Sequence, residues 1–308
     1  MKRVAVCVVL MLGLHAVASA QQFTQWSAPV NMGPVVNSPY TDSCVTVSKN
    51  GLSMFFFSNR YAKDVNAAWH LYVSRRPSVD TPWGEPQEIV GFNEGYPASC
   101  PGLSPDEHRL FFASGRPGTC GGGDIWVSRR HDRTDDFGWQ PPVNLGCEPN
   151  GPNSPQGENL PTVFEDETGT EVLYMGSGRP GLGGGDIWAS RMRPDGTFGP
   201  ATLVTELSTI YSDTGGLAVR RDGLEVIFGS NRPDPNRPGG TDLWAATRAS
   251  TAHPWSAPVL LLILNSATFD GGRMSFSFDG RVLYFTSDRP GGYGSRDFYV
   301  ATREKLRQ

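Results

Sequence analysis

The sequence predicts an all-β protein: a five-bladed β-propeller whose blades are four-stranded antiparallel sheets. Three observations predict it. The chain has 37 glycines and 25 prolines in 308 residues, spread in short clusters that favour many short strands over long helices. Charged residues make up 19% and aromatic residues 11%, which is typical of a folded chain rather than a disordered one. Finally, one pattern of about 57 residues recurs five times along the chain.

The N-terminal residues have the pattern of a secretory signal peptide. Lys2 and Arg3 precede an apolar stretch at residues 4–17, and small residues up to Ala20 suit a cleavage site. We expect residues 1–20 to be removed and residues 21–308 to form one propeller domain; an uncleaved anchor is the alternative. Removal of two basic residues changes the net charge from −4 to −6. A periplasmic or secreted protein with no membrane span after cleavage is expected.

Four cysteines remain after this cleavage, which suggests two disulfides in an oxidising compartment. The preferred pair is Cys120 with Cys147, because both fall on the same face of the second repeat. Cys44 and Cys100 occupy equivalent positions in neighbouring repeats, and they can pair if their Cα atoms lie within about 7 Å. Free buried thiols are the alternative, and the cysteine spacing does not resemble a zinc site.

The repeats are recognised by three landmarks. An aromatic residue opens the last strand of each unit, at intervals of 57, 56, 59 and 57 residues: Trp26, Trp83, Trp139, Phe198 and Trp255. A hydrophobic strand that runs into Ser-x-Arg recurs at residues 55–60, 111–116, 173–179, 226–232 and 283–289. An Asp-apolar-aromatic triplet recurs at residues 124–126, 186–188, 242–244 and 297–299.

Each unit is predicted to contain four strands, and the second unit shows them in order. Its strands are expected at residues 100–104, 109–114, 125–129 and 139–145, with a turn at 105–107 and a glycine-rich loop at 115–123. Four short antiparallel strands repeated around an axis form a propeller. The chain begins with a fourth-strand motif at residues 26–32 and ends with a third-strand motif at 297–302. Pairing of these two segments would complete the last blade and close the ring.

These motifs resemble the TolB-type, or WD40-like, β-propeller repeat. The resemblance rests on residues 277–280, 283–292 and 297–299, is repeated in the second to fourth copies, and covers residues 22–303. It implies a propeller that serves as an interaction scaffold. The first copy departs from the pattern, because residues 61–70 replace the glycine-rich loop and Trp69 or His70 stands where the aspartate is expected.

An arginine and an aspartate flank the glycine-rich loop in four copies, and we interpret them as a structural device. The aspartate would accept loop N–H groups and the arginine would brace it; contact with a ligand or calcium is the alternative. The glycines supply turn conformations rather than a phosphate cradle, because a strand follows the loop and no lysine is present. The pairs are Arg116 with Asp124, Arg179 with Asp186, Arg232 with Asp242, and Arg289 with Asp297.

Candidate ligand-binding residues lie where the copies differ, near the start of each innermost strand. A funnel of acids, tyrosines and one arginine suits a sugar or peptide, although the same residues can cap turns and solvate a channel. The candidates are Tyr40, Asp42, Tyr96, Glu158, Tyr211, Asp213, Asp270 and Arg273.

The function expected from these patterns is non-catalytic binding of a protein, peptide or envelope glycan through the loop face, by a monomer. The sequence has no G-x-S-x-G or H-E-x-x-H motif, and its acidic net charge argues against nucleic acid. The alternative is a glycoside hydrolase or lyase that uses Asp42, Glu158, Asp213 and Asp270, by fold-level analogy with five-bladed furanosidases. No metal or cofactor is expected; calcium held by the acidic mouth is the alternative.

Overall fold

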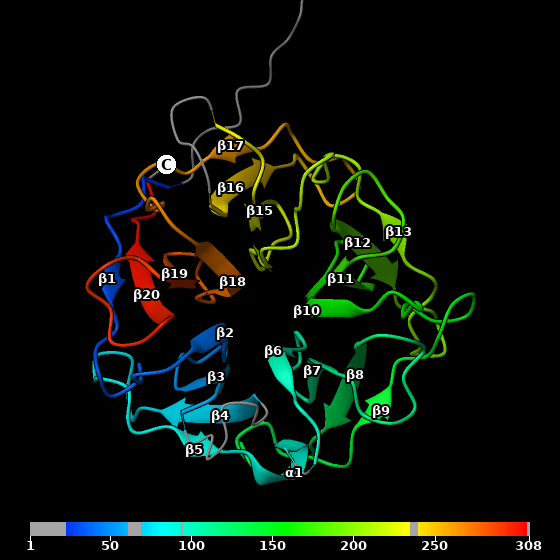
Figure 1. The fold of residues 1–308 in the computed structure, drawn as a ribbon, viewed down its shortest axis with the longest axis horizontal. Coiled ribbons are helices and arrows are strands. Elements are labelled where there is room, and N and C mark those ends of the chain that lie inside the picture. The colour runs from blue at the N-terminus through cyan, green and yellow to red at the C-terminus, as the bar shows by residue number, and fades with distance from the viewer. Residues whose placement is uncertain (1–22, 61–68, 94, 235–239, 307–308) are drawn as a thin grey trace, which may run out of the picture.

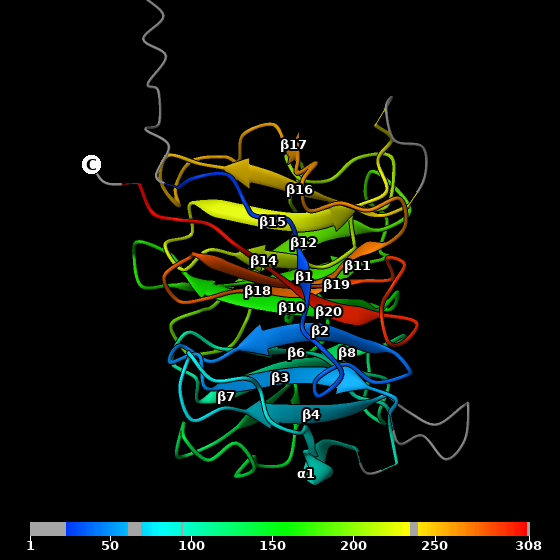
Figure 2. The same cartoon turned by 90° about the vertical axis from the view of Figure 1, so that its left-hand side faces the viewer.

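Five four-stranded antiparallel sheets surround a central axis as the blades of a propeller (Figure 1). This computed structural model describes residues 23–60, 69–93, 95–234 and 240–306. Seen from the side, the strands cross a disc whose two faces carry the connecting loops (Figure 2). The predicted fold class is therefore confirmed. The predicted signal peptide at residues 1–20 lies outside the described residues, and within the described ranges no helix is long and apolar enough to cross a bilayer.

Each blade begins with its innermost strand at the axis, and its remaining strands follow outward. Blade one contains β2 (Asp42–Val47), β3 (Ser53–Ser58), β4 (His70–Arg75) and β5 (Gln87–Glu88). A short helix, α1 (Val90–Asn93), leads to blade two, with β6 (Ser99–Leu103), β7 (Arg109–Ser114), β8 (Asp124–Arg129) and β9 (Val143–Asn144). Blade three contains β10 (Glu158–Glu165), β11 (Glu171–Ser177), β12 (Asp186–Arg191) and β13 (Thr202–Leu203). Blade four contains β14 (Leu217–Val219), β15 (Glu225–Ser230), β16 (Asp242–Thr247) and β17 (Val259–Leu260).

Blade five is completed by both ends of the chain, as predicted. Its strands are β18 (Asp270–Phe276), β19 (Val282–Ser287), β20 (Asp297–Thr302) and, outermost, β1 (Val30–Asn31). Val30 pairs with Val300 and Asn31 with Tyr299 in antiparallel register. The N-terminal strand thus covers the edge of the last blade, and backbone hydrogen bonds close the ring.

The outermost strands are shorter than the sequence predicts. In blade two a strand was expected over residues 139–145, but β9 has two residues and Trp139 forms only an isolated bridge with Arg130. Pro141 and Pro142 lie between the bridge and the strand. Because proline has no N–H, these two residues cannot donate to the ladder.

A bulge interrupts the innermost strands near the axis. The pairing register shifts between Ser43 and Thr46 in blade one, and comparable shifts occur in blades two, three and five. One residue per blade has a positive φ at this level: Cys44, Cys100, Leu160, Gly216 and Gly272. A bulge bends its strand and changes the direction of nearby side chains. The repeat pattern did not predict it, because these five positions hold three residue types, of which only glycine favours a positive φ.

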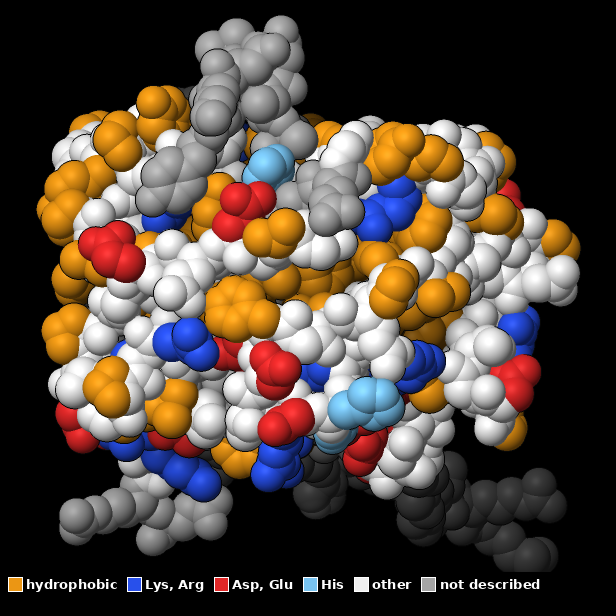
Figure 3. All heavy atoms as spheres, turned by 90° about the horizontal axis from the view of Figure 1, so that it is seen from below, with side chains coloured by type: hydrophobic (Ala, Val, Ile, Leu, Met, Phe, Trp, Pro, Cys, Tyr) orange, Lys and Arg blue, Asp and Glu red, His pale blue; other side chains and the backbone are white. Residues whose placement is uncertain are grey.

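Aromatic and aliphatic side chains from neighbouring blades pack into shared cores. Between blades one and two, Phe55 and Phe57 of β3 lie in one cluster with Phe112 and Trp126. On the outer side of the ring near α1, hydrophobic side chains gather across the middle of the face and acidic and basic ones lie around them (Figure 3). The packed cores fix the blades against one another, so the loops on each face are held on a rigid frame.

Candidate functional site

The four acids predicted at the channel mouth are buried and bound by arginines of their own blades. Each carboxylate accepts a hydrogen bond from an arginine Nη2: Asp42 from Arg60 at 2.6 Å, Glu158 from Arg179 at 2.7 Å, Asp213 from Arg232 at 2.6 Å, and Asp270 from Arg289 at 2.6 Å. All four carboxylate side chains have no exposed surface. These acids are ion-paired inside the blades rather than free in the channel.

The same carboxylates also cap the loop that enters each innermost strand. Each accepts the backbone N–H and the hydroxyl group of the residue four positions earlier: Ser38, Ser154, Thr209 and Ser266. One carboxylate therefore connects a loop to the arginine at the end of the second strand. Charge-assisted bonds of this kind are among the stronger ones in proteins.

The predicted pairing of each repeat arginine with the loop aspartate is wrong. The aspartates do accept loop N–H groups, as expected: Asp124 from Cys120, Asp186 from Leu182, and Asp297 from Tyr293. The arginines, however, fold back onto the serine two residues earlier and reach the innermost strand. Arg179, Arg232 and Arg289 bind the carboxylates there, whereas Arg116 has no carboxylate partner among the described residues.

Asp124 is a loop aspartate whose pKa is shifted from its ordinary value. Burial raises the pKa of this carboxyl, and the nearby charge of Glu158 raises it further, against hydrogen bonds from Asn144 and Cys120. With Cys120 and Cys147 it forms the one cluster of metal-ligand type among the described residues. The two sulfur atoms of that cluster are joined to each other, so they are not available to a metal.

Both predicted disulfides are present. Cys120 and Cys147 are bonded with their Cα atoms 5.5 Å apart. Cys44 and Cys100 are bonded at 4.6 Å, within the predicted limit, and they connect the bulges of blades one and two at the axis. Two disulfides agree with export to an oxidising compartment.

Arg273 lies inside the channel rather than at its mouth, where the sequence placed it. Its Nε donates to the Pro161 carbonyl at 2.6 Å and its Nη1 to the Val45 carbonyl at 2.9 Å. Burial lowers the pKa of the guanidinium to about 9. The side chain lies across the channel and separates two hollows. The inner strands line the loop-face hollow with residues that precede the contacts of Arg273, and the opposite hollow with residues that follow them.

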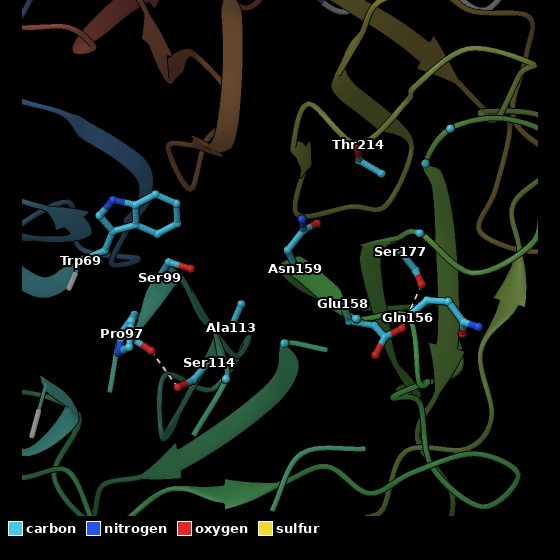
Figure 4. Close-up of a pocket in the computed structure, with 16 residues that line it drawn as sticks. Trp69, Pro97, Ser99, Ala113, Ser114, Gln156, Glu158, Asn159, Ser177 and Thr214 are labelled. Carbon is cyan, nitrogen blue, oxygen red and sulfur yellow. Dashed lines mark hydrogen bonds between the residues drawn. The ribbon is translucent and has the colours of Figure 1, made fainter. Parts of the chain in front are cut away.

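The hollow on the loop face, which we call the mouth pocket, has a volume of about 460 Å³. It lies between blades one, two, three and four, and its lining includes Trp69, Ser99, Gln156, Glu158, Asn159 and Thr214. Trp69 and Ser99 stand on one side, and Glu158, Asn159 and Gln156 on the other (Figure 4). The indole of Trp69 is 49% exposed and rests against Phe57, with ring centroids 5.1 Å apart.

Of the eight predicted ligand-binding residues, Glu158 alone lines the mouth pocket. Tyr40, Tyr96 and Tyr211 are exposed in loops of the same face but are not part of its lining. Sequence reasoning missed Trp69, Ser99, Gln156, Asn159 and Thr214 as site residues. A signal for Trp69 was present, because it stands where the first repeat departs from the pattern.

No protein-family model and no curated protein sequence matches this chain. Solved structures do match. The catalytic domain of the Coprinopsis cinerea GH62 α-L-arabinofuranosidase superposes with a TM-score of 0.56 at 12% identity, covering 92% of this chain and 98% of that one. The endo-arabinase from Bacteroides thetaiotaomicron gives 0.54 at 18% identity, with 91% and 99% covered. The α-L-arabinofuranosidase from Lactobacillus brevis gives 0.54 at 14% identity, with 91% and 95% covered.

These matches correct two expectations. The resemblance to the TolB-type or WD40-like family is wrong, because the three structures named above, which match nine-tenths of the chain, are arabinofuranosidases and an arabinase. The expectation of a non-catalytic propeller that binds a protein, peptide or envelope glycan is contradicted by the same finding. At these identities the matches themselves show a shared fold; substrate and chemistry are argued below from the pocket.

Proposed function

We propose that the protein is a carbohydrate-active enzyme that binds and hydrolyses a glycan in the mouth pocket. The observation that carries this proposal is an exposed indole facing amide, hydroxyl and carboxylate groups across a hollow of about 460 Å³. Sugar rings have apolar C–H faces that stack on aromatic rings and hydroxyl groups that bond to polar side chains. The arabinofuranosidases and the arabinase of similar fold support the same class of substrate.

Glu158 is the candidate catalytic residue, in the role of base; its side chain is buried in the wall of the pocket, so the reaction requires the attacking water to reach it there. Among the described residues that line the pocket it is the one carboxylate. Arg179 and the hydroxyls of Ser154 and Ser177 hold it in a fixed position at the start of β10. A positioned carboxylate can accept a proton from an attacking water as the water oxygen bonds to the anomeric carbon; the glycosidic C–O bond breaks and the leaving oxygen takes a proton from solvent in the pocket. We assign no reacting role to Asp42, Asp213 and Asp270, which lie outside the pocket lining.

The protein is proposed to act as a monomer in the periplasm or outside the cell. The disulfides and the predicted leader support this location. Calcium is not required by the proposed chemistry, since the four inner carboxylates are already engaged by arginines.

The test is hydrolysis by protein purified from an exporting host, offered arabinan, arabinoxylan, galactan and polygalacturonate, with release of reducing sugar as the measurement. Trp69→Ala should weaken glycan binding about three- to tenfold, through the loss of ring stacking. Phe278→Ala is the matched control, because this ring is 42% exposed on the opposite face. The proposal is wrong if no glycan is bound or cleaved, or if both substitutions weaken binding equally.

A further inference from the structure

Five arginines occupy equivalent positions around the loop face. Each donates from Nε to the serine two residues earlier, at 2.9 to 3.1 Å, and from Nη2 to a backbone carbonyl of the loop before the innermost strand, at 2.5 to 3.0 Å. They are Arg60, Arg116, Arg179, Arg232 and Arg289. The fivefold repetition means that a difference in one blade can be judged against four others.

Blade two differs, because its arginine has lost the carboxylate. The acid that starts the other innermost strands is replaced by Ala98, which is completely buried. Ser114 donates its hydroxyl to the Pro97 carbonyl at 2.7 Å, whereas the equivalent Ser177 and Ser230 donate to carboxylates. Arg116 consequently carries a charge that no carboxylate among the described residues neutralises.

This arginine is next to the mouth pocket. Pro97, Ser114 and Gly115 line the pocket, and Arg116 is bonded to Ser114 and follows Gly115 in the chain. Pro97 and Ser114 stand on the same wall as Ser99 (Figure 4). Arg116 itself is half-buried, and this burial lowers the pKa of its guanidinium. A partly desolvated cation without a counter-charge is stabilised by an anion that reaches it.

We propose that Arg116 binds a carboxylate of the ligand, so that the glycan recognised by the mouth pocket contains a uronic acid. This inference rests on the proposed function and names its substrate class. The planar guanidinium is suited to a carboxylate, to which it can donate two parallel hydrogen bonds. In the other four blades the protein supplies that carboxylate itself; in blade two the ligand supplies it.

The experiment compares oligogalacturonides with their fully methyl-esterified forms, which have the same backbone without the negative charge. Isothermal titration should show that the wild-type protein binds the acidic form about tenfold or more tightly. Arg116→Gln should abolish this preference, and Arg116→Lys should keep part of it. Ala98→Asp should also abolish it, because an internal carboxylate would occupy Arg116, while Ala98→Ser should retain it. Thermal melting confirms that each variant is folded.

Other outcomes overturn the proposal in distinguishable ways. Equal binding of acidic and esterified forms, or binding of neutral glycans alone, refutes the role of Arg116 and leaves the proposed function standing. Failure to bind any glycan refutes both. If the wild-type protein shows no preference and Glu94→Gln, at a position outside the described residues, creates one, an internal partner neutralises the arginine and the proposal is overturned.

Discussion

Glu158 and Asp213 offer a matched pair of substitutions that separate stability from function. Each carboxylate accepts four hydrogen bonds from equivalent groups: a loop N–H and hydroxyl four residues earlier, the hydroxyl of Ser177 or Ser230, and the Nη2 of Arg179 or Arg232. Both side chains are fully buried. The difference is that Glu158 lines the mouth pocket and Asp213 does not.

Glu158→Gln and Asp213→Asn should therefore destabilise the fold equally and affect turnover unequally. Removing one partner of a buried ion pair costs about 3 to 5 kcal/mol, because the remaining charge loses its buried counter-charge. Arg179 would keep only Glu148, 3.7 Å away and 45% exposed, and an exposed partner of this kind contributes little. For a domain of this size that corresponds to a melting temperature lower by roughly 6 to 10 °C. Loss of a positioned base lowers the turnover of Glu158→Gln about a hundredfold or more, and Asp213→Asn should retain wild-type turnover.

The assay is thermal unfolding by circular dichroism, followed by glycan hydrolysis well below the lower midpoint. We expect the two variants to have equal melting temperatures and Glu158→Gln alone to lose turnover. Equal loss of turnover in both variants would show that the activity depends on blade integrity and not on a base in the pocket. Full turnover in Glu158→Gln would refute the assignment of Glu158 outright.

Three further predictions follow from the loops, the disulfides and one buried acid. Gly183→Ala should cost about 1 to 3 kcal/mol of stability, because a Cβ there would lie 2.0 Å from the Tyr211 carbonyl oxygen. Gly184→Ala is the control and should be neutral, because its Cβ would meet nothing within 4 Å. The midpoints of urea unfolding compare the two variants. Replacing Cys120 and Cys147 by serine should lower the free energy of unfolding by about 3.5 kcal/mol, and replacing Cys44 and Cys100 by about 4 kcal/mol, because the two bonds close sequence separations of 27 and 56 residues. Denaturant unfolding measures both, and the opposite order would contradict this chain-entropy reasoning. Burial alone would raise the pKa of Asp166, but hydrogen bonds from Thr168, Thr170 and Arg191 hold that pKa below its ordinary value of 3.8, so its contribution to stability is present above that pH and is lost as the pH falls below it. Asp166→Asn should flatten the acid side of the curve of unfolding free energy against pH, and an unchanged curve would refute the assignment.

The repeat signal predicted the ring because it is local. Each landmark, such as Ser-x-Arg at Arg179 or the triplet at Asp186, encodes strand, loop and strand within one blade, and five copies predict five blades. The loop aspartates were also placed correctly, since their N–H donors lie within four residues. The same local pattern predicted closure of the ring, because its incomplete units stand at the two ends of the chain.

The hydrogen-bond partners of the repeat arginines could not be predicted from their spacing along the sequence. Arg232 and Asp242 flank one loop, yet the arginine binds Asp213, nineteen residues earlier, because an antiparallel hairpin brings the start of the innermost strand beside the end of the second. Likewise, Arg273 blocks the channel because the bulge redirects its strand and places carbonyls of two other blades around it.

The sequence by itself determined the blade count and the three inner strands of each blade, because these follow from periodicity; it favoured the Cys120–Cys147 pair and left the second pair open until the Cα atoms of Cys44 and Cys100 were found 4.6 Å apart. The tertiary structure decided which residues form the pocket. Trp69, Ser99, Glu158 and Thr214 come from four blades, and they meet only when the ring closes. It also showed that Arg116 lacks the carboxylate present in four other blades, since Ala98 is recognised as a missing acid only once the inner strands are superposed. Residues at equivalent positions of the repeat therefore differ in their chemistry, because different groups surround them in the closed ring.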